Sequence, residues 1–158
     1  MRRLTLCEVG MPITRRELCG LLPVVVPVAL EMPAFASSQE ILPSGSFAFD
    51  KLSVEERDHA EIRHVMKGKL ATGESVEVHE STLPPNGFPH APHHHQHSEL
   101  WLVRGGMVEL TIEGQKHVLH AGDVGFVRSN QEHGIRNPGT ETANYFVIAI
   151  GPGADTQA

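Results

Sequence analysis

Residues 87–106, GFPHAPHHHQHSELWLVRGG, form the densest group of metal-capable side chains in this 158-residue sequence. Within them His93, His95 and Glu99 follow one another at even spacing, and further histidines occupy positions 90, 94 and 97. Neutral imidazole and carboxylate together suit a divalent first-row metal such as Mn, Fe, Co, Ni or Zn. The stretch is therefore a candidate metal site. The alternative is a solvated His-rich loop with incidental metal affinity.

A shared ion requires the chain to turn between the two histidines and the glutamate. On one straight strand His93 and Glu99 would lie about 20 Å apart, at roughly 3.3 Å per residue. Ligands of one ion each lie about 2.0–2.2 Å from it. We therefore expect a turn at residues 96–98, with His-x-His ending one short strand and Glu99 starting the next. Side chains alternate faces along a strand, so Trp101 shares the face of Glu99 and is a candidate pocket wall.

The sequence pattern predicts that the elements that position these side chains are β-strands. From residue 61 onward, short apolar-rich runs recur every 8 to 12 residues between turn residues, a spacing typical of a sandwich or barrel. The glycine pair 105–106 predicts a hairpin, because a type I′ turn takes positive φ at both central positions. The expected strands cover residues 61–70, 74–83, 100–104, 107–113, 116–120, 124–128, 134–137 and 145–150.

A second stretch, residues 122–137 (GDVGFVRSNQEHGIRN), completes a pattern that resembles the two motifs of the cupin superfamily. The first motif is met without a gap, and the second by its glycine, histidine and asparagine; the matching residues are Gly87, His93, His95, Glu99, Gly106, Gly122, His133 and Asn137. Arg128 stands where the family usually has proline, and Asn130 where it has glycine. Asparagine tolerates the left-handed conformation that glycine would adopt there.

The resemblance covers about residues 60 to 150 and implies an all-β fold, a double-stranded β-helix or jelly-roll barrel in a single domain. Carried over position by position, it implies His93, His95, Glu99 and His133 as metal ligands. His133 would then arrive from the strand pair opposite the first motif. Asn137 would be a structural residue rather than a ligand.

Residues 1–36 differ in composition from the rest of the chain. Arg15 and Arg16 precede an apolar run at 21–30, and Ala34-Phe35-Ala36 precedes Ser37. These features predict a secretory signal peptide of the twin-arginine type, cleaved before Ser37. The run is broken by two prolines and falls short of the about 20 apolar residues that span a bilayer. An uncleaved membrane tether is the alternative. The expected localisation is periplasmic or secreted, by the twin-arginine or the general secretory route.

Cleavage would leave an N-terminal arm at 37–59, the barrel at 60–150 and a disordered tail at 151–158. Four of the 13 basic and three of the 19 acidic residues lie in the leader, so the mature chain would carry a net charge of −7. Such a charge argues against nucleic acid or an anionic membrane as a partner. Cys7 and Cys19 also lie in the leader, which leaves neither a disulfide nor a thiolate nucleophile.

The arm and the outer strand faces bear on assembly. Phe47-Ala48-Phe49 is a candidate edge strand, by analogy with small cupins in which such a strand packs across a dimer. Residues 53–59 fit one helical turn capped by Ser53. Leu100 and Leu102 would point outward and leave apolar strand surface in water. We therefore expect a homodimer that buries this face.

Three further side chains are candidates for the pocket. His97 lies an even number of residues from His93, His95 and Glu99, so its side chain should share their face of a strand. It is a candidate acid–base group at the pocket mouth. Glu77 and His79 lie in the strand before the first motif. If they face inward, they would orient a ligand imidazole. If they face outward, they are plain surface residues.

Three neutral histidines and one glutamate would leave two positions of an octahedral ion open to water, O₂ or a chelating substrate. A structural zinc site, in contrast, is closed and tetrahedral. We expect one divalent transition metal, Mn or Fe by preference, with Ni, Co, Cu or Zn as alternatives. The expected function is dioxygenase-like oxidation of a small oxygenated organic substrate. A lyase or isomerase comes next, and a non-catalytic periplasmic cupin that binds metal or a small ligand is the rival from another class.

Overall fold

The computed structural model describes residues 41–156, so the predicted leader and the start of the arm lie outside the described residues. The described part contains β-strands, one short 3-10 helix and no α-helix. None of its helices is long and apolar enough to cross a membrane. The elements are η2 (Phe49–Lys51), β1 (Ser53–Arg57), β2 (Ala60–Lys69), β3 (Ser75–Leu83), β4 (Ser98–Gly105), β5 (Met107–Ile112), β6 (Gln115–His120), β7 (Val124–Val127), β8 (His133–Arg136) and β9 (Ala143–Ile150).

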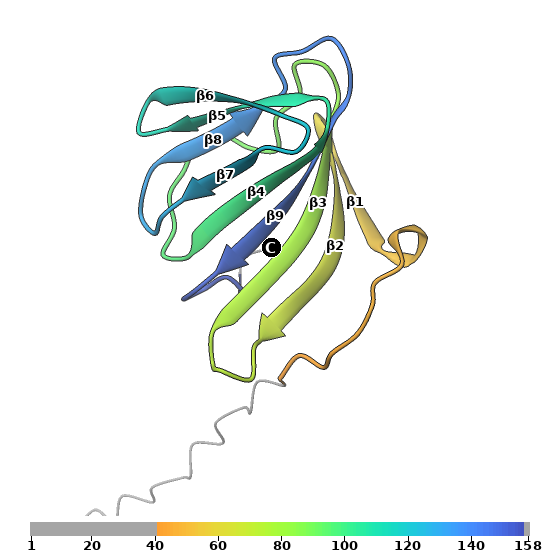
Figure 1. Ribbon diagram of the computed structural model, residues 1–158, viewed down its shortest axis with the longest axis vertical. Helices are drawn as coiled ribbons and strands as arrows, with labels where there is room; N and C mark the ends of the chain where they lie inside the picture. Colours follow the sequence, from red (N-terminus) through yellow and green to blue (C-terminus); the bar gives the residue numbers. More distant parts are fainter. Residues whose placement is uncertain (1–40, 157–158) are drawn as a thin grey trace, which may run out of the picture. The chain divides into compact units, whose positions relative to one another are not determined.

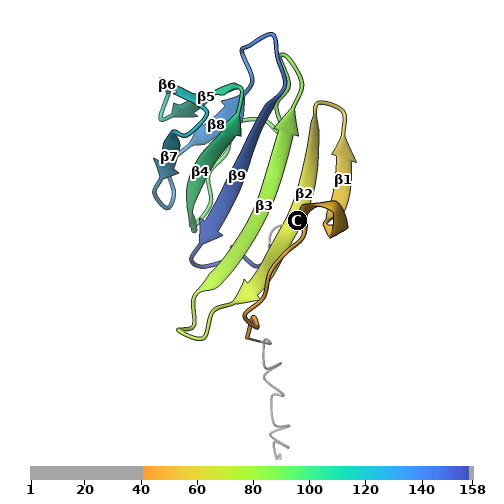
Figure 2. The ribbon, with the colours of Figure 1, turned by 45° about the vertical axis from the view of Figure 1, so that its right-hand side comes forward.

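These strands form two antiparallel sheets (Figure 1). The larger sheet has six strands in the order β1-β2-β3-β9-β4-β7, and the smaller has three in the order β6-β5-β8. Figure 2 shows the strands of the larger sheet following one another, with the smaller sheet beyond its β4 and β7 edge. The sandwich or barrel predicted from the turn spacing, and the all-β jelly roll implied by the resemblance, are confirmed. The expected strand positions between residues 61 and 150 agree with the observed ones to within a few residues.

Burial alternates between successive side chains in several strands, which gives each of them an inner and an outer face. In β9 the side chains of Ala143, Tyr145, Val147 and Ala149 are buried, and those between them are more exposed. The register of β3, β9 and β4 aligns the inward side chains in rows across the larger sheet. The core lies between the sheets and includes Leu83, Trp101, Val103, Val108, Leu110, Val127, Ile135, Tyr145 and Val147.

The hairpin predicted at Gly105-Gly106 is wrong. β4 pairs with β7 and β9 in the larger sheet, whereas β5 pairs with β6 and β8 in the smaller one. Gly106 has φ 68°, and a Cβ there would lie 2.7 Å from the carbonyl oxygen of Thr142. Glycine therefore allows the chain to pass close to residue 142 as it crosses between sheets. Two consecutive residues of positive φ, Glu113 (48°) and Gly114 (77°), instead close the hairpin of β5 and β6.

The arm differs from both predictions made for it. Residues 47–49 form no strand, and residues 53–57 form strand β1 rather than a helical turn. β1 pairs with β2 through the turn at Asp58-His59, so the free backbone edge of β2 supplies hydrogen bonds that a lone helical turn would lack. Phe49 lies 4.7 Å below the guanidinium of Arg63 and 5.0 Å below that of Arg104, outside the core.

The disordered tail predicted from residue 151 is corrected for residues 151–156. These residues form turns, in which the N–H groups of Ala154 and Thr156 donate to the carbonyls of Gly151 and Gly153. Ala154 is buried, so contact with the barrel orders a segment whose composition alone suggests disorder.

Candidate metal centre

His93 and His133 are held opposite each other by their own backbones. The N–H of each donates to the carbonyl of the other, at 2.9 Å from His93 and 2.8 Å from His133. Pro92 packs on Gly134, where an added Cβ would meet the proline ring at 3.0 Å. The loop before β4 is therefore docked on the start of β8, which belongs to the smaller sheet.

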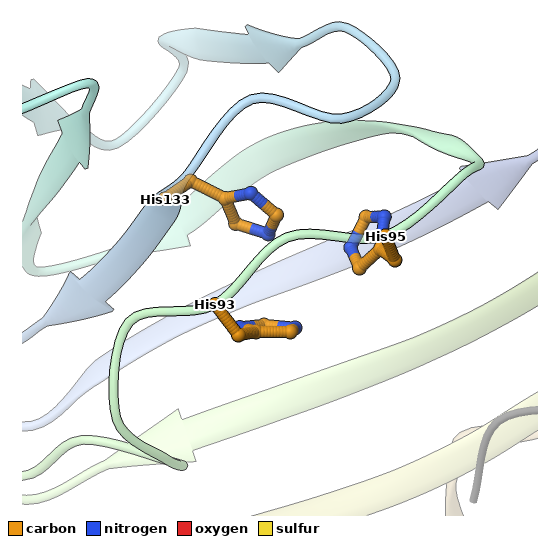
Figure 3. Close-up of side chains that lie close together, drawn as sticks. All are labelled: His93, His95 and His133. Atoms are coloured by element: carbon orange, nitrogen blue, oxygen red, sulfur yellow. The ribbon is translucent and has the colours of Figure 1, made fainter.

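The third histidine, His95, is placed by a contact two residues beyond His93. Its carbonyl accepts a hydrogen bond of 2.8 Å from the N–H of Asn130, which has the left-handed φ of 62°. Figure 3 shows the side chains of His93 and His95 on the loop and of His133 on β8, gathered around one space. One ring nitrogen of each lies within 4.8 Å of the others. This cluster can bind a metal ion.

Two of these rings are locked in one tautomer. Nδ1 of His95 lies 3.0 Å from the carbonyl oxygen of His97, and Nδ1 of His133 lies 2.8 Å from that of Gln131. A carbonyl only accepts, so each Nδ1 carries hydrogen and each neutral ring keeps its lone pair on Nε2. These Nε2 atoms and Nδ1 of His93 are buried without a hydrogen-bond partner. Unpaired buried nitrogens that converge on one point fit a divalent cation.

Glu99, the first inward residue of β4, joins the cluster. Its Oε1 lies 3.0 Å from Nε2 of His95, and its Oε2 lies 3.5 Å from Nε2 of His133. A carboxylate oxygen facing an imidazole lone pair is repelled, whereas a cation between them attracts both. The position of Glu99 therefore fits a fourth ligand, and its charge matches the ion.

The pKa values favour the metal-binding protonation states of two groups. Burial raises the pKa of the Glu99 carboxyl, but the adjacent imidazoles of His133, His95 and His97 outweigh burial, so the pKa lies far below its usual range. Burial and the neighbouring histidines lower the pKa of His93 to about 4. Burial lowers the pKa of His95, but Glu99 outweighs it and the net shift is upward. At neutral pH Glu99 is thus an anion and His93 is neutral, as ligands must be.

A cavity of about 650 Å³ opens beside the cluster, within the usual size range of ligand sites. His93, Glu99 and His133 line it together with Trp101, whose ring lies 5.4 Å from that of His133 in a T-shaped contact. Another part of the lining comes from β2 and β3. Side chains that line the cavity from those strands are Ile62, His64, Glu77, His79 and Ser81.

Comparison with known proteins agrees with this geometry. A family model described as "Cupin domain" matches residues 79–149, which contain all four candidate ligands. The fold is similar to that of an RmlC-like cupin from Shewanella frigidimarina NCIMB 400, at 20% identity and a TM-score of 0.57, over 68% of this chain and 91% of that chain. The chain contains a small cupin domain.

Other solved structures similar to this cupin domain have different names. A predicted oxalate decarboxylase from Thermotoga maritima is 18% identical with a TM-score of 0.57, over 67% of this chain and 98% of that chain. The polyketide cyclase RemF from Streptomyces resistomycificus is 17% identical with a TM-score of 0.56, over 68% of this chain and 80% of that chain. At these identities the likeness shows the fold alone.

The structure corrects the predicted place of His97 in the cupin domain. Its side chain is only 2% exposed and is not among those that line the cavity. Its ring stacks on that of His95 at a centroid distance of 3.5 Å, and its Nε2 lies 3.3 Å from Oε1 of Glu99. Because β4 begins only at Ser98, His97 still belongs to the loop and packs behind the cluster instead of standing at the pocket mouth.

Glu77 and His79 face inward and line the cavity, so they are not plain surface residues. They bond to each other, with Nδ1 of His79 2.9 Å from Oε2 of Glu77. Backbone carbonyls, rather than these side chains, orient the imidazoles of His95 and His133. The sequence gives no signal for that arrangement.

Sequence reasoning missed His64, which lies outside both motifs and is exposed, yet also lines the cavity. It is paired in register with His79 across β2 and β3. The alternation of β2, with Ile62 buried, was the available signal, since residues two apart share a face.

Asn137 joins the ends of β3 and β8 to the loop before β9, in keeping with a structural role. Its buried Nδ2 lies 3.0 Å from the carbonyl oxygen of Leu83, 3.1 Å from that of Pro84 and 2.7 Å from that of Glu141, and its Oδ1 accepts from the N–H of Gly139 at 2.9 Å. Segments far apart in the chain therefore meet at this one amide.

Proposed function

We propose that this cupin domain is a metal-dependent enzyme acting on a small oxygenated organic molecule. The observation that carries the proposal is the set of buried, unpartnered imidazole nitrogens beside the anionic Glu99, at the edge of the cavity. His93, His95, Glu99 and His133 would hold one divalent ion. When bound, that ion supplies Lewis acidity and positions for oxygen ligands or O₂. Trp101 excludes water on one side, and the wall of β2 and β3 faces the substrate.

The first candidate reaction is dioxygenase-like oxidation of a phenolic or a diketone. Three neutral imidazoles and one carboxylate are hard enough to hold Mn or Fe, although Cu and Zn bind more tightly to nearly any nitrogen and oxygen site. We propose that the protein is exported in a folded state and filled beforehand, from the controlled metal pools of the cytoplasm. Mn or Fe would then be the native metal, with Ni, Co, Cu or Zn entering a refolded apoprotein.

Metal analysis of protein exported by its own host, followed by oxygen-uptake assays with phenolics and diketones, tests this proposal. We expect about one equivalent of Mn or Fe per chain, with oxygen consumption that stops on chelation and resumes when the same metal is restored. Protein that contains chiefly Zn or Cu contradicts the proposed native metal. A metal-loaded protein that consumes no oxygen contradicts the oxidation.

A lyase or isomerase is the second candidate, and the pair formed by Glu77 and His79 favours it. Both reactions move protons on the substrate, and this pair places an imidazole held by a carboxylate on the cavity wall. Slow conversion of a substrate without oxygen uptake would support this candidate. Tight ligand binding without any turnover would instead support a non-catalytic periplasmic binding protein.

Assembly as a homodimer completes the proposal. Leu102, Val124 and Phe126 are exposed on the outer face of the larger sheet, where β4 pairs with β7. Covering this apolar face with a second copy of the chain removes it from water.

A further inference from the structure

The cavity wall formed by β3 carries a polar pair, Glu77 and His79, that is separate from the candidate metal ligands. Nδ1 of His79 lies 3.0 and 2.9 Å from the two oxygens of Glu77. A carboxylate accepts only, so Nδ1 donates and a neutral His79 keeps its lone pair on Nε2. Residues 41–156 provide no hydrogen-bond partner for that Nε2. A neutral His79 therefore offers an unpaired Nε2 lone pair on a side chain that lines the cavity.

The register of the larger sheet sets the distance from this base to the metal centre. Glu77 is paired with Ala149, and Ala149 with Glu99. In the next inward row His79 is level with Trp101, with one strand between them. Neighbouring strands lie about 4.8 Å apart, so the two backbones are roughly 10 Å apart across the sheet. A small organic molecule held beside Glu99 can reach toward His79.

The other histidine of this wall offers a matched comparison. His64 is paired with His79 in register and lines the same cavity, but its side chain is 43% exposed and its Nε2 lies 3.2 Å from Glu55. The side chain of His79 is 21% exposed and that of Glu77 only 12%. Each histidine has a carboxylate partner, but Glu77 leaves Nε2 of the less exposed His79 free, whereas Glu55 occupies Nε2 of His64.

We propose that His79 takes a proton from the substrate and returns it, that Glu77 holds its imidazole in the required tautomer, and that the substrate is an α-hydroxy carbonyl compound. This inference rests on the proposed function, because the two adjacent oxygens of such a substrate would bind the ion that His93, His95, Glu99 and His133 would hold. In the step, the C–H bond next to the carbonyl breaks and its proton goes to Nε2 of His79. Its electron pair forms the C=C bond of an enediolate, whose charge rests on the former carbonyl oxygen. Return of the proton to carbon regenerates the neutral imidazole, and no oxidant is needed.

Hydrogen exchange into dihydroxyacetone tests this step. The full-length protein, purified with its own metal, is incubated with dihydroxyacetone in D₂O, and loss of the C–H signal is followed by proton NMR. We expect His79→Gln to slow the exchange at least about 100-fold, the usual contribution of a general base. Glu77→Gln should slow it about 10-fold, and the control His64→Gln less than about 3-fold, with equal metal content throughout.

A second measurement is independent of activity. Nitrogen-15 NMR of the His79 ring in metal-free protein should show the hydrogen on Nδ1, with this preference kept in Glu77→Gln and lost in Glu77→Ala. Because this NMR measurement uses the wild type and the Glu77 variants, it still tests the proposal if His79→Gln fails to fold.

Several outcomes overturn the proposal. They are an Nε2–H tautomer in the wild type, a wild-type rate in His79→Gln, a larger effect of His64→Gln, or no exchange by the metal-loaded wild type. Absence of exchange by the metal-loaded wild type would overturn the role of His79 without contradicting the metal centre. Absence of metal from the native protein contradicts the proposed function, whatever the exchange rate.

Discussion

The replacement of Asn137 by alanine probes the contact that joins the ends of three segments. The amide of Asn137 has two hydrogens facing three carbonyls, and its oxygen accepts from Gly139. The side chain is fully buried, so water cannot replace these bonds. Each buried group left unpaired costs about 1–3 kcal/mol. With two to three such groups, we expect Asn137→Ala to lower the free energy of unfolding by about 3–5 kcal/mol, or a melting temperature lower by roughly 10–20 °C.

Urea denaturation of the metal-free protein, followed by tryptophan fluorescence, measures this loss without a contribution from bound ion. Asn144→Ala is the matched control, because the Asn144 amide donates a single bond of 2.8 Å to Oγ1 of Thr82 and is only partly buried. We expect the control to cost about 1 kcal/mol. If Asn137→Ala costs no more than Asn144→Ala, the reasoning from buried unpaired groups is refuted.

The same replacement should weaken metal binding, although Asn137 is not a ligand. Its backbone accepts a hydrogen bond from Asn86 and donates one to Gly87, at the start of the loop that carries His93 and His95. Four residues earlier in the chain stands His133. Loss of the amide therefore loosens both segments that bring ligands together, and equilibrium dialysis of Asn137→Ala should show a raised dissociation constant for Mn²⁺.

Four further predictions follow from the site, the sheet and the leader. Glu99→Gln should lower the retention of a bound divalent ion at least about 10-fold, measured by metal analysis after gel filtration, because it removes the anionic ligand. Burial raises the pKa of Glu80 against the opposing effect of nearby arginines. A raised pKa contributes stability at low pH that is lost as pH rises, so urea midpoints should show the wild type losing stability relative to Glu80→Gln as the pH rises above about 4.5. Leu102→Lys should convert the proposed dimer to a monomer in light scattering. Mature exported protein should begin at or near Ser37, as N-terminal sequencing will show.

Each of these predictions has a contradicting outcome. Ion retention in Glu99→Gln equal to that of the control Glu109→Gln, a carboxylate outside the cavity, excludes Glu99 as a ligand. A stability difference that is constant or grows with pH refutes the argument on Glu80. A monomeric wild type at micromolar concentration contradicts the dimer. An N-terminus at Met1 or Met11 contradicts cleavage.

The strands and the candidate ligands could be predicted from the sequence because their signals are local. Alternation along Glu99, Trp101 and Val103 assigns those residues to one face without knowledge of the neighbouring strands. The structure agrees, since Trp101 and Val103 are buried while Leu102 is exposed. The even spacing of His93, His95 and Glu99 likewise required only a turn between them. His133 needed the motif resemblance, because no local rule connects it with residues some forty positions earlier.

The remaining features of the fold and the site depend on contacts between segments that are far apart in the sequence. The glycine pair at 105–106 is compatible with a hairpin, yet β5 pairs with β6 and β8 in the other sheet, and Gly106 lets the chain pass close to residues 142–143. Whether Glu77, His79 and His64 would face a cavity depended on which strands lay beside them, and residues 151–156 are ordered by burial of Ala154. By itself the sequence therefore determined which residues form strands and which can bind a metal. Only the tertiary structure decided which strands are neighbours, which imidazoles are fixed by backbone carbonyls and which side chains share the cavity, since those contacts join segments that are distant along the chain.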